Sequence, residues 1–248
     1  MQGTKKRFYE KNKKVNRNFD TSLDEILTQS SPWPVQEAYK ALRTNVVFSI
    51  PGSGCKVIGI CSSMMHEGKS INAINLALSF AQLGKKTLLI DCDLRKPTVA
   101  MRLKIKNQLG LSNLLTGQCR ASEAFVRLPK FGIDVLAAGS IPPDPTWLLA
   151  SNQMDQLLAN MRERYDIIII DMPPVMSVSD ALIMSKNVDG YILVIRHNFS
   201  DFRAIDDAMT AFKRADAKVI GFLYNDVTQG RKGYRKSYYY NSYYYYRR

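Results

Sequence analysis

The stretch KVIGICSSMMHEGKS, residues 56–70, joins a run of apolar and β-branched residues to a short loop that ends in Gly-Lys-Ser. The apolar first half has the length and composition of a buried strand. The second half fits the pattern G-x-x-x-x-G-K-[ST], with Gly68, Lys69 and Ser70 in place and Ser63 at the first glycine position. Backbone N–H groups in such a loop stand at a helix N-terminus and form a cradle for phosphate. The stretch therefore predicts a strand, a phosphate-binding loop and a helix in succession.

The rest of the chain repeats this alternation of short apolar runs and amphipathic stretches. Strands are expected at 56–61, 87–90, 133–138, 165–171, 190–195 and 218–224, and helices at 35–48, 70–82, 145–161 and 200–214. Strands that are apolar on both faces and separated by helices indicate an α/β fold: a mostly parallel sheet of the P-loop NTPase type, with helices on both faces. Ligands of such sheets bind at the carboxyl ends of the strands.

Two further strand ends carry carboxylates. TLLIDCD places Asp91 and Asp93 at the end of one strand, and IIIIDMPP places Asp171 at the end of another. Carboxylates beside a phosphate loop are placed to hold Mg²⁺ or its waters, while Lys69 would reach the β- and γ-phosphates and the Ser70 hydroxyl would ligate the metal. Because the three elements occur together and in order, the pattern favours an ATP and Mg²⁺ site over solvated strand-end aspartates.

The net charge of +13 lies mostly at the two ends of the chain. Residues 1–20 carry seven Lys and Arg against two acids, and residues 229–248 carry six against none, so the ends supply 11 of the 13. This distribution predicts a basic flexible N-terminal arm at 1–20, a P-loop domain at 21–228 and a flexible tail at 229–248. Such arms attract polyanions, including an anionic membrane surface.

Several classes of protein are disfavoured by what the sequence lacks. No run approaches the roughly 20 apolar residues of a membrane span, and the N-terminus has no apolar core of the kind that a signal peptide requires. We therefore expect a cytoplasmic protein. The four cysteines form no C-x-x-C pair and the chain has only two histidines, so buried reduced thiols are expected rather than a cysteine metal site.

These motifs together resemble those of the bacterial tyrosine kinases (BY-kinases), in their stand-alone cytoplasmic form. The resemblance runs from about Pro34 to the C-terminus, and its carriers are SSMMHEGKS, LLIDCDLRKP, IIIIDMPP, EAYKALRTN, GLSNLLTG, GSIPPDPTWLLAS, GFLYNDV and a tyrosine-rich tail. The D-x-D-L-R-K-P element is the most specific, because it distinguishes this family from other P-loop ATPases. The resemblance implies a protein-tyrosine kinase that regulates capsular or extracellular polysaccharide synthesis.

The resemblance also implies roles for individual residues. Asp91 would orient or deprotonate the attacking phenol, while Asp93 and Asp171, with Ser70, would serve Mg²⁺. The implied nucleotide-binding set is Ser63, Glu67, Gly68, Lys69, Ser70, Ile71 and Asn225. The resemblance implies that Asn225 and Arg196 contact adenine, although an ordinary turn asparagine fits position 225 equally well. Arg95 and Lys96 either neutralise phosphate charge or are surface cations of a strand-to-helix loop.

Two departures from the family pattern have physical consequences. Met65-His66 replaces the Pro-Gly of the family's loop, which removes one flexible residue and could change the loop geometry. His66 itself is interpreted as a loop histidine without a chemical role. The family's E-x-x-R-x-x-R oligomer interface is present as Glu37, Lys40 and Arg43. Lys40 keeps the charge but loses the bidentate fork, so ring assembly through this helix could be weaker.

The tail SYYYNSYYYYRR, residues 237–248, holds seven tyrosines in twelve residues. Tyrosines among Ser, Asn and Arg, with no apolar alternation to anchor them, suit an exposed arm that can enter an active site as substrate. The expected phosphorylation sites are Tyr238, Tyr239, Tyr240, Tyr243, Tyr244, Tyr245 and Tyr246. Phosphorylation would add about −1.5 to −2 per tyrosine and reverse the charge of the tail.

The implied partners are a transmembrane chain-length regulator, further copies of the chain in a ring and a cognate tyrosine phosphatase. Recruitment to the inner face of the plasma membrane would occur through the first of these. No nucleic acid is expected, although interleaved Arg and Tyr can stack on single strands. Two alternative functions remain: a partition-type P-loop ATPase, disfavoured because Ser62, Ser63 and Met64 stand where that class has a second lysine, and a nucleotide-binding scaffold without kinase activity.

Overall fold

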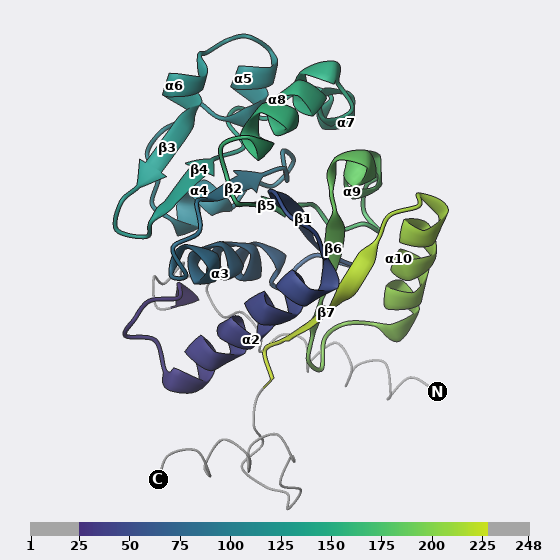
Figure 1. Ribbon diagram of the computed structural model, residues 1–248. Helices are drawn as coiled ribbons and strands as arrows, with labels where there is room; N and C mark the ends of the chain where they lie inside the picture. The colour runs from purple at the N-terminus through teal and green to yellow at the C-terminus, as the bar shows by residue number, and fades with distance from the viewer. Residues whose placement is uncertain (1–24, 228–248) are drawn as a thin grey trace, which may run out of the picture.

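The computed structural model describes residues 25–227 and shows a seven-stranded sheet with the order β3-β4-β2-β5-β1-β6-β7 (Figure 1). The strands are β1 (Lys56–Ser62), β2 (Thr87–Asp91), β3 (Phe125–Leu128), β4 (Ile133–Leu136), β5 (Ile167–Asp171), β6 (Gly190–Arg196) and β7 (Val219–Asn225). All neighbouring strands pair in parallel except β3, which runs antiparallel to β4 at one edge. Every residue of β2 and β5 is buried, as expected for strands covered on both faces.

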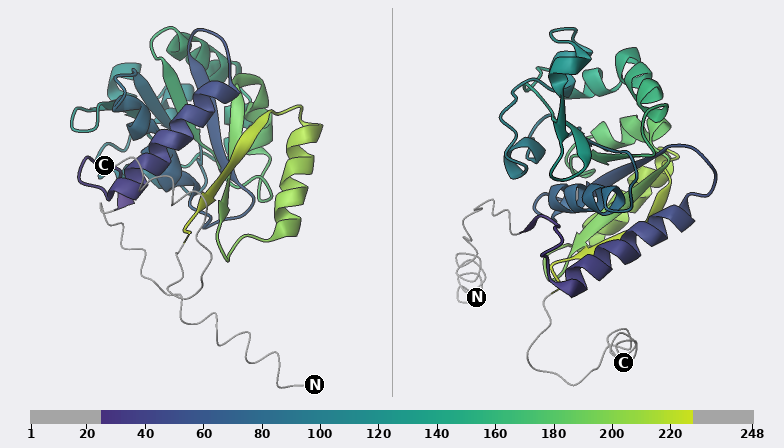
Figure 2. Two further views of the ribbon diagram at one scale, coloured as in Figure 1. Left: turned by 60° about the horizontal axis from the view of Figure 1, so that its bottom comes forward. Right: turned by 60° about the vertical axis from the view of Figure 1, so that its left-hand side comes forward.

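The helices cover both faces of this sheet. They are α2 (Trp33–Ser49), α3 (Lys69–Ala81), α4 (Val99–Arg102), α5 (Leu111–Leu115), α6 (Ala121–Ala124), α7 (Pro145–Leu149), α8 (Asn152–Arg162), α9 (Asp180–Ile183) and α10 (Phe202–Arg214), with the 3-10 turn η3 (Met184–Asn187). One core cluster packs α2, α3 and α4 against the sheet, and the other packs α5, α8, α9 and α10 against the opposite face. In Figure 2, α2 lies along α3, on the outside of the molecule. The expected α/β fold of the P-loop NTPase type is confirmed.

Three local expectations need correction. The helix expected at 145–161 is two helices, because the Ser151 side chain accepts the N–H of Met154 and starts α8 as a new helix. Asp144 caps the preceding α7 in the same way through the N–H of Trp147. The antiparallel strand β3 was not expected. Two of the four free cysteines, Cys55 and Cys119, are only partly buried.

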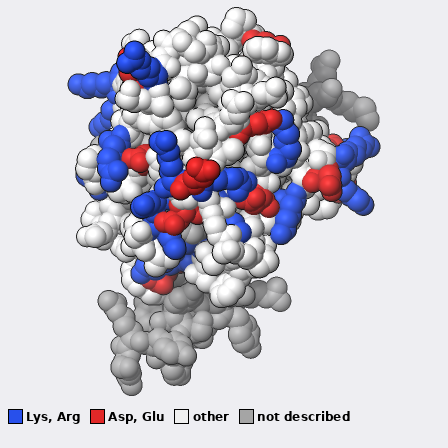
Figure 3. Space-filling view, turned by 45° about the horizontal axis from the view of Figure 1, so that its top comes forward, with Lys and Arg blue, Asp and Glu red and all other residues white. Residues whose placement is uncertain are grey.

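The two arms expected at 1–20 and 229–248, and every tyrosine of the tail cluster, lie outside the described residues. Between residues 25 and 227, none of the helices has both the length and the apolar character needed to cross a membrane. Figure 3 shows one face of the molecule, on which Lys and Arg side chains are interleaved with Asp and Glu.

Candidate active site

The predicted site residues meet at the carboxyl ends of three adjacent strands. β1 leads into the phosphate loop, which ends at the first turn of α3, and Lys69 and Ser70 are the first two residues of that helix. β5 lies between β1 and β2, and Asp171 is the register partner of both Ile60 and Asp91. Side chains paired across neighbouring strands point to the same face of the sheet. The strand order therefore brings carboxylates 80 residues apart in sequence to one place.

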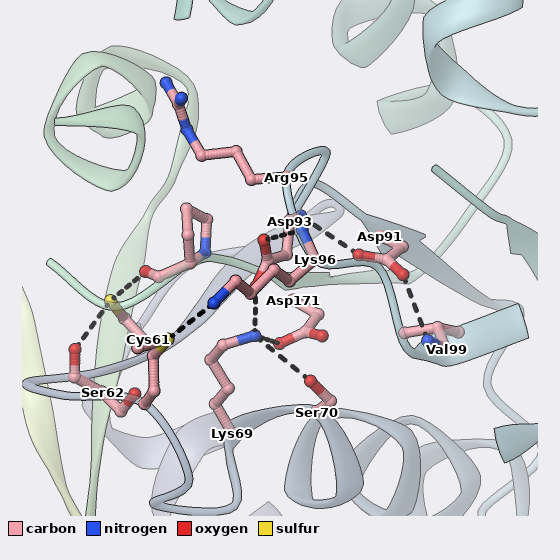
Figure 4. Close-up of polar contacts among 12 residues, drawn as sticks. Cys61, Ser62, Lys69, Ser70, Asp91, Asp93, Arg95, Lys96, Val99 and Asp171 are labelled. Carbon is pink, nitrogen blue, oxygen red and sulfur yellow. Dashed lines mark hydrogen bonds and ion pairs between the residues drawn. The ribbon is translucent and has the colours of Figure 1, made fainter. Parts of the chain in front are cut away.

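Lys69 bridges this group of acids (Figure 4). Its Nζ lies 2.7 Å from Asp93 Oδ2, 3.5 Å from Asp171 Oδ1 and 3.3 Å from Ser70 Oγ. Burial disfavours the ammonium, but the charges of Asp171 and Asp93 outweigh that effect and raise the pKa of Lys69 above its ordinary value. The lysine stays charged and compensates part of the negative charge that would otherwise collect at the strand ends.

Asp171 keeps both carboxylate oxygens without a hydrogen-bond partner, although the residue is fully buried. Burial raises the pKa of Asp171, and the charge of Lys69 opposes that shift. A buried polar group without a partner costs about 1–3 kcal/mol, so a fold retains one only where something else binds it. Among the described residues, no three carboxylate, thiol or imidazole groups are placed to form a metal cage of protein ligands alone. Mg²⁺ does not need such a cage, because it takes one or two carboxylates together with phosphates and waters. Asp171, Asp93 and the Ser70 hydroxyl fit that ion.

Asp91 has a different environment from Asp93. Its side chain is fully buried, and its two oxygens accept the backbone N–H groups of Asp93 and Val99, each at 3.1 Å. Burial and the nearby charge of Asp171 raise the pKa of Asp91 well above its ordinary value. Asp91 thus holds the loop 93–99 in place, and Asp93 points from that loop toward Lys69 (Figure 4).

Glu67 organises the phosphate loop from within. Its carboxylate accepts the hydroxyl of Ser63 at 3.0 Å and the N–H of Met64 at 2.8 Å, and it also accepts a short hydrogen bond from the Ser200 hydroxyl. Only 1% of Glu67 is exposed. The serine at the first glycine position therefore has a defined role, since it closes the loop on Glu67. Because its oxygens are turned to these donors, Glu67 shapes the loop and does not present its carboxylate outward.

Asn225 packs against the end of the same loop. Its Nδ2 donates to the carbonyl of Glu67 at 3.0 Å, and a Cβ on Gly68 would lie 2.1 Å from that nitrogen. Gly68 also has φ +96°, so both the backbone and the neighbour require glycine there. His66 has φ 67°, a left-handed conformation that costs a non-glycine residue free energy. The substitution of Met-His for Pro-Gly thus places a Cβ where the loop favours glycine.

Arg95 and Lys96 diverge although they are neighbours in sequence. Arg95 Nε lies 3.1 Å from Asp180 Oδ2, and Arg95 Nη2 donates to Thr146 Oγ1 at 2.7 Å. Its side chain points away from Asp93 (Figure 4), so this conformation does not support a phosphate role for Arg95. Lys96 Nζ instead lies 3.4 Å from the sulfur of Met65, above the phosphate loop. Of the two cations, Lys96 is the one that lies beside the phosphate loop.

Comparison with known proteins agrees with this geometry. The family model of an AAA domain matches residues 55–218. The tyrosine-protein kinase YwqD of Bacillus subtilis is 38% identical over 76% of this chain and 80% of its own length. The putative tyrosine-protein kinase CapB of Staphylococcus aureus is 33% identical over 83% and 89% of the two chains.

The chain belongs to the bacterial tyrosine kinases. Among solved structures, the kinase domain of the Escherichia coli tyrosine kinase ETK superposes with a TM-score of 0.76 at 30% identity, covering 82% of this chain and 80% of that one. The expected enzyme class, protein-tyrosine kinase, is that of the family. This enzyme class is therefore preferred over the two alternatives, a partition-type ATPase and a nucleotide-binding scaffold without kinase activity.

The helix that carries the family's oligomer motif has a partly internal role in this bacterial tyrosine kinase. Glu37 and Lys40 form an exposed pair on α2 at 2.8 Å. Arg43 instead donates to the backbone carbonyl of Ser79 on α3, so it fastens α2 to the body. Tyr39 donates to Asn72 Oδ1 at 2.8 Å, and Asn72 Nδ2 donates to the Gly68 carbonyl at 2.9 Å. α2 is thereby linked to the phosphate loop through α3.

Sequence reasoning missed several residues of this site. Ser200 is 133 residues from Glu67, and no local pattern marks it. Asp180 is fully buried and accepts from both Arg95 and Thr146, the latter at 2.7 Å. No local pattern marks Asp180 either, because its partners Arg95 and Thr146 are 85 and 34 residues away in sequence.

Proposed function

We propose that this bacterial tyrosine kinase uses Mg²⁺-ATP to phosphorylate its own C-terminal tyrosines, Tyr238 to Tyr240 and Tyr243 to Tyr246. The observation that carries the proposal is the fully buried Asp171 carboxylate without a hydrogen-bond partner, next to the phosphate loop lysine. It supports a metal-dependent phosphoryl transfer at this edge of the sheet. The tail supplies phenols on an arm that begins where β7 ends, beside the loop.

In this proposal, the residues of the site have the following roles. The loop amides and Lys69 bind the phosphates, and Asp93, Asp171 and Ser70 hold Mg²⁺. When bound, Mg²⁺ neutralises the charge that develops on the transferred phosphoryl group. The tyrosine oxygen forms a bond to the γ-phosphorus, the bond to the bridging oxygen breaks with its electron pair leaving on ADP, and Asp91 accepts the phenol proton. Both oxygens of Asp91 accept backbone N–H groups and the residue is buried, so this role requires the loop 93–99 to move when the phenol arrives.

The biological setting follows from the family. We place the kinase in the control of capsular or extracellular polysaccharide synthesis, together with a transmembrane chain-length regulator that recruits it to the inner face of the membrane. Ring formation through Glu37, Lys40 and Arg43, and reversal by a tyrosine phosphatase, complete the cycle. The internal hydrogen bond of Arg43 predicts that the exposed Glu37 and Lys40 contribute more than Arg43 to contacts between copies.

The proposal is tested by incubating the purified chain with Mg²⁺-ATP and mapping phosphate by mass spectrometry, with and without the cytoplasmic segment of a candidate partner. Lys69→Met is the control, because it removes the cation that bridges Asp93 and Asp171. Phosphate on Tyr238 to Tyr246 that is absent in the control supports the autokinase. ATP consumption with every tail tyrosine unmodified under both conditions contradicts it.

A further inference from the structure

Large apolar side chains from three separate segments of the chain are exposed around the candidate active site. Trp147 is 68% exposed, Met176 is 45% exposed and Met65 is 42% exposed. We refer to these three residues as the apolar rim. Their positions in sequence are far apart, so their neighbourhood in space comes from the fold.

Each member of the apolar rim belongs to a segment that contacts a loop of the site. The sulfur of Met65 lies 3.4 Å from Lys96 Nζ. The N–H of Met176 donates to the carbonyl of Ser63, at the start of the phosphate loop, at 3.3 Å. Trp147 follows Thr146, whose hydroxyl is 2.7 Å from the Arg95 guanidinium. The segments that carry the rim therefore border the loops that carry Lys69 and Asp93.

We propose that the apolar rim is a docking surface for the tyrosine rings that flank the reacting tyrosine of the C-terminal tail. Each of the seven tail tyrosines has another tyrosine directly next to it in sequence. Whichever phenol approaches Lys69 and Asp93, an aromatic ring accompanies it one residue away. Indole and thioether groups both make favourable contacts with aromatic rings.

This surface explains how one site could accept a cluster of tyrosines without reading a specific sequence. Residues 228–248, outside the described residues, follow the end of β7 after two intervening residues, and the segment is long enough to present each tyrosine in turn, in its own site or that of a second copy. Phosphate on a flanking ring would add charge to an apolar contact and weaken it. The inference rests on the proposed function, because the tail must be the substrate.

Binding of the rings is measured first, without ATP. Trp33→Phe leaves Trp147 as the single tryptophan of the full chain, so its fluorescence reports on the rim. A tail peptide with every tyrosine replaced by phenylalanine, SFFFNSFFFFRR, is compared with one in which serine replaces them. We expect the phenylalanine peptide alone to shift the emission of Trp147 to shorter wavelength, because its rings exclude water from the indole, and about fivefold weaker binding of that peptide in Met176→Ala. An equal shift with both peptides, or none, would overturn the inference.

Transfer is then measured on peptides with one tyrosine flanked either by phenylalanine or by serine. The expected result is a KM about fivefold lower for the phenylalanine-flanked peptide, with kcat unchanged. Trp147→Ala should abolish that difference and Trp147→Phe should restore it. Phe222→Ala, which truncates a 52%-exposed ring on the edge strand β7, is the matched control and should leave it unchanged.

The two steps separate this inference from the proposed function. A ring-dependent shift of the Trp147 emission with no transfer to any tyrosine peptide would contradict the proposed function and leave the docking surface in place. Transfer with the same KM for both peptides in the wild-type chain would overturn the docking surface and leave the kinase in place.

Discussion

At the scale of single residues, the site retains two features that lower the stability of the fold. Asp171 is a buried carboxylate with no hydrogen-bond partner, and His66 occupies a left-handed backbone conformation without being glycine. Such features are retained where function requires them or where the surrounding structure enforces them. Each therefore predicts the effect of one substitution.

Asp171→Asn should stabilise the fold while it abolishes phosphoryl transfer. Asparagine removes a buried charge that has no hydrogen bond and is only partly offset by Lys69 Nζ at 3.5 Å, and Lys69 keeps its pair with Asp93. We expect a gain of about 1–2 kcal/mol in the free energy of unfolding at neutral pH, measured by urea denaturation. Mg²⁺-ATP should raise the melting temperature of the wild type and not of the variant, because the proposed metal ligand is missing.

The pH dependence of this gain has a defined sign. Since the pKa of Asp171 is raised in the folded state, the unfolded chain releases this proton at lower pH, and stability falls as pH rises from the ordinary value of about 3.9 through the folded pKa. The advantage of Asp171→Asn should thus be full above the folded pKa and shrink as pH falls toward 4. A gap that widens on acidification would contradict the raised pKa.

His66→Gly should raise stability by about 0.5–1 kcal/mol, because glycine adopts φ 67° without the clash of a Cβ. His66→Ala is the matched control, since it removes the imidazole and keeps the Cβ. In a domain of this size, each kcal/mol of stability raises the melting temperature by roughly 2–4 °C, which calorimetry can measure. An equal rise in both variants would show that the ring, and not the backbone, sets the cost.

At the scale of the elements, the fold was predictable where periodicity and strand-end chemistry were strong, and not where distant contacts decide. β1, β2, β5 and β6 were visible as apolar runs, and Lys69, Asp91, Asp93 and Asp171 were visible as strand-end and loop motifs. The break at Ser151 was missed because one capping hydroxyl overrides a helical pattern that runs on through it. β3 is an edge strand that is only partly buried, so it lacks a continuous apolar run. Ser200 and Asp180 contact residues that are far from them in sequence, and such contacts leave no local sequence pattern.

Asp180, on α9, also contacts Thr146 on α7 and Arg95 in the loop 93–99, so it connects these three segments. Asp180→Asn keeps the shape but removes the charge that Arg95 faces, so we expect a loss of about 1–2 kcal/mol in stability and a lower kcat. Asp155→Asn is the matched control, because its pair with Lys186 is exposed and should change stability by no more than about 0.5 kcal/mol. Equal effects of the two substitutions, measured by denaturation and by initial rates, would show that the burial of Asp180 gives its pair with Arg95 no special role.

At the scale of the whole molecule, the distribution of charge separates the body from its ends. Residues 21–228 hold 22 basic and 20 acidic residues, while the tail 229–248 carries six cations and no acid. The sheet places the acids of two strands, β2 and β5, at one edge, so a cationic tail is attracted to the site in which its tyrosines would react. Attraction of this kind is screened by salt, which makes both docking and assembly dependent on ionic strength.

We therefore expect phosphorylation of the tail to dissociate the oligomer in which the tail is phosphorylated. Seven phosphotyrosines would add roughly −10 to −14 to a tail with six cations, so the tail becomes an anion facing carboxylates. Incubation with Mg²⁺-ATP is expected to shift the mass in light scattering from oligomer to monomer for the wild type, whereas Lys69→Met stays assembled and dissociates only when salt is raised. If the unphosphorylated chain is monomeric at low salt, or if the phosphorylated chain remains assembled, the charge of the tail does not control assembly. In that case the exposed pair Glu37 and Lys40 on α2 would have to carry the contact alone, and Lys40→Arg should then strengthen it by restoring the bidentate fork.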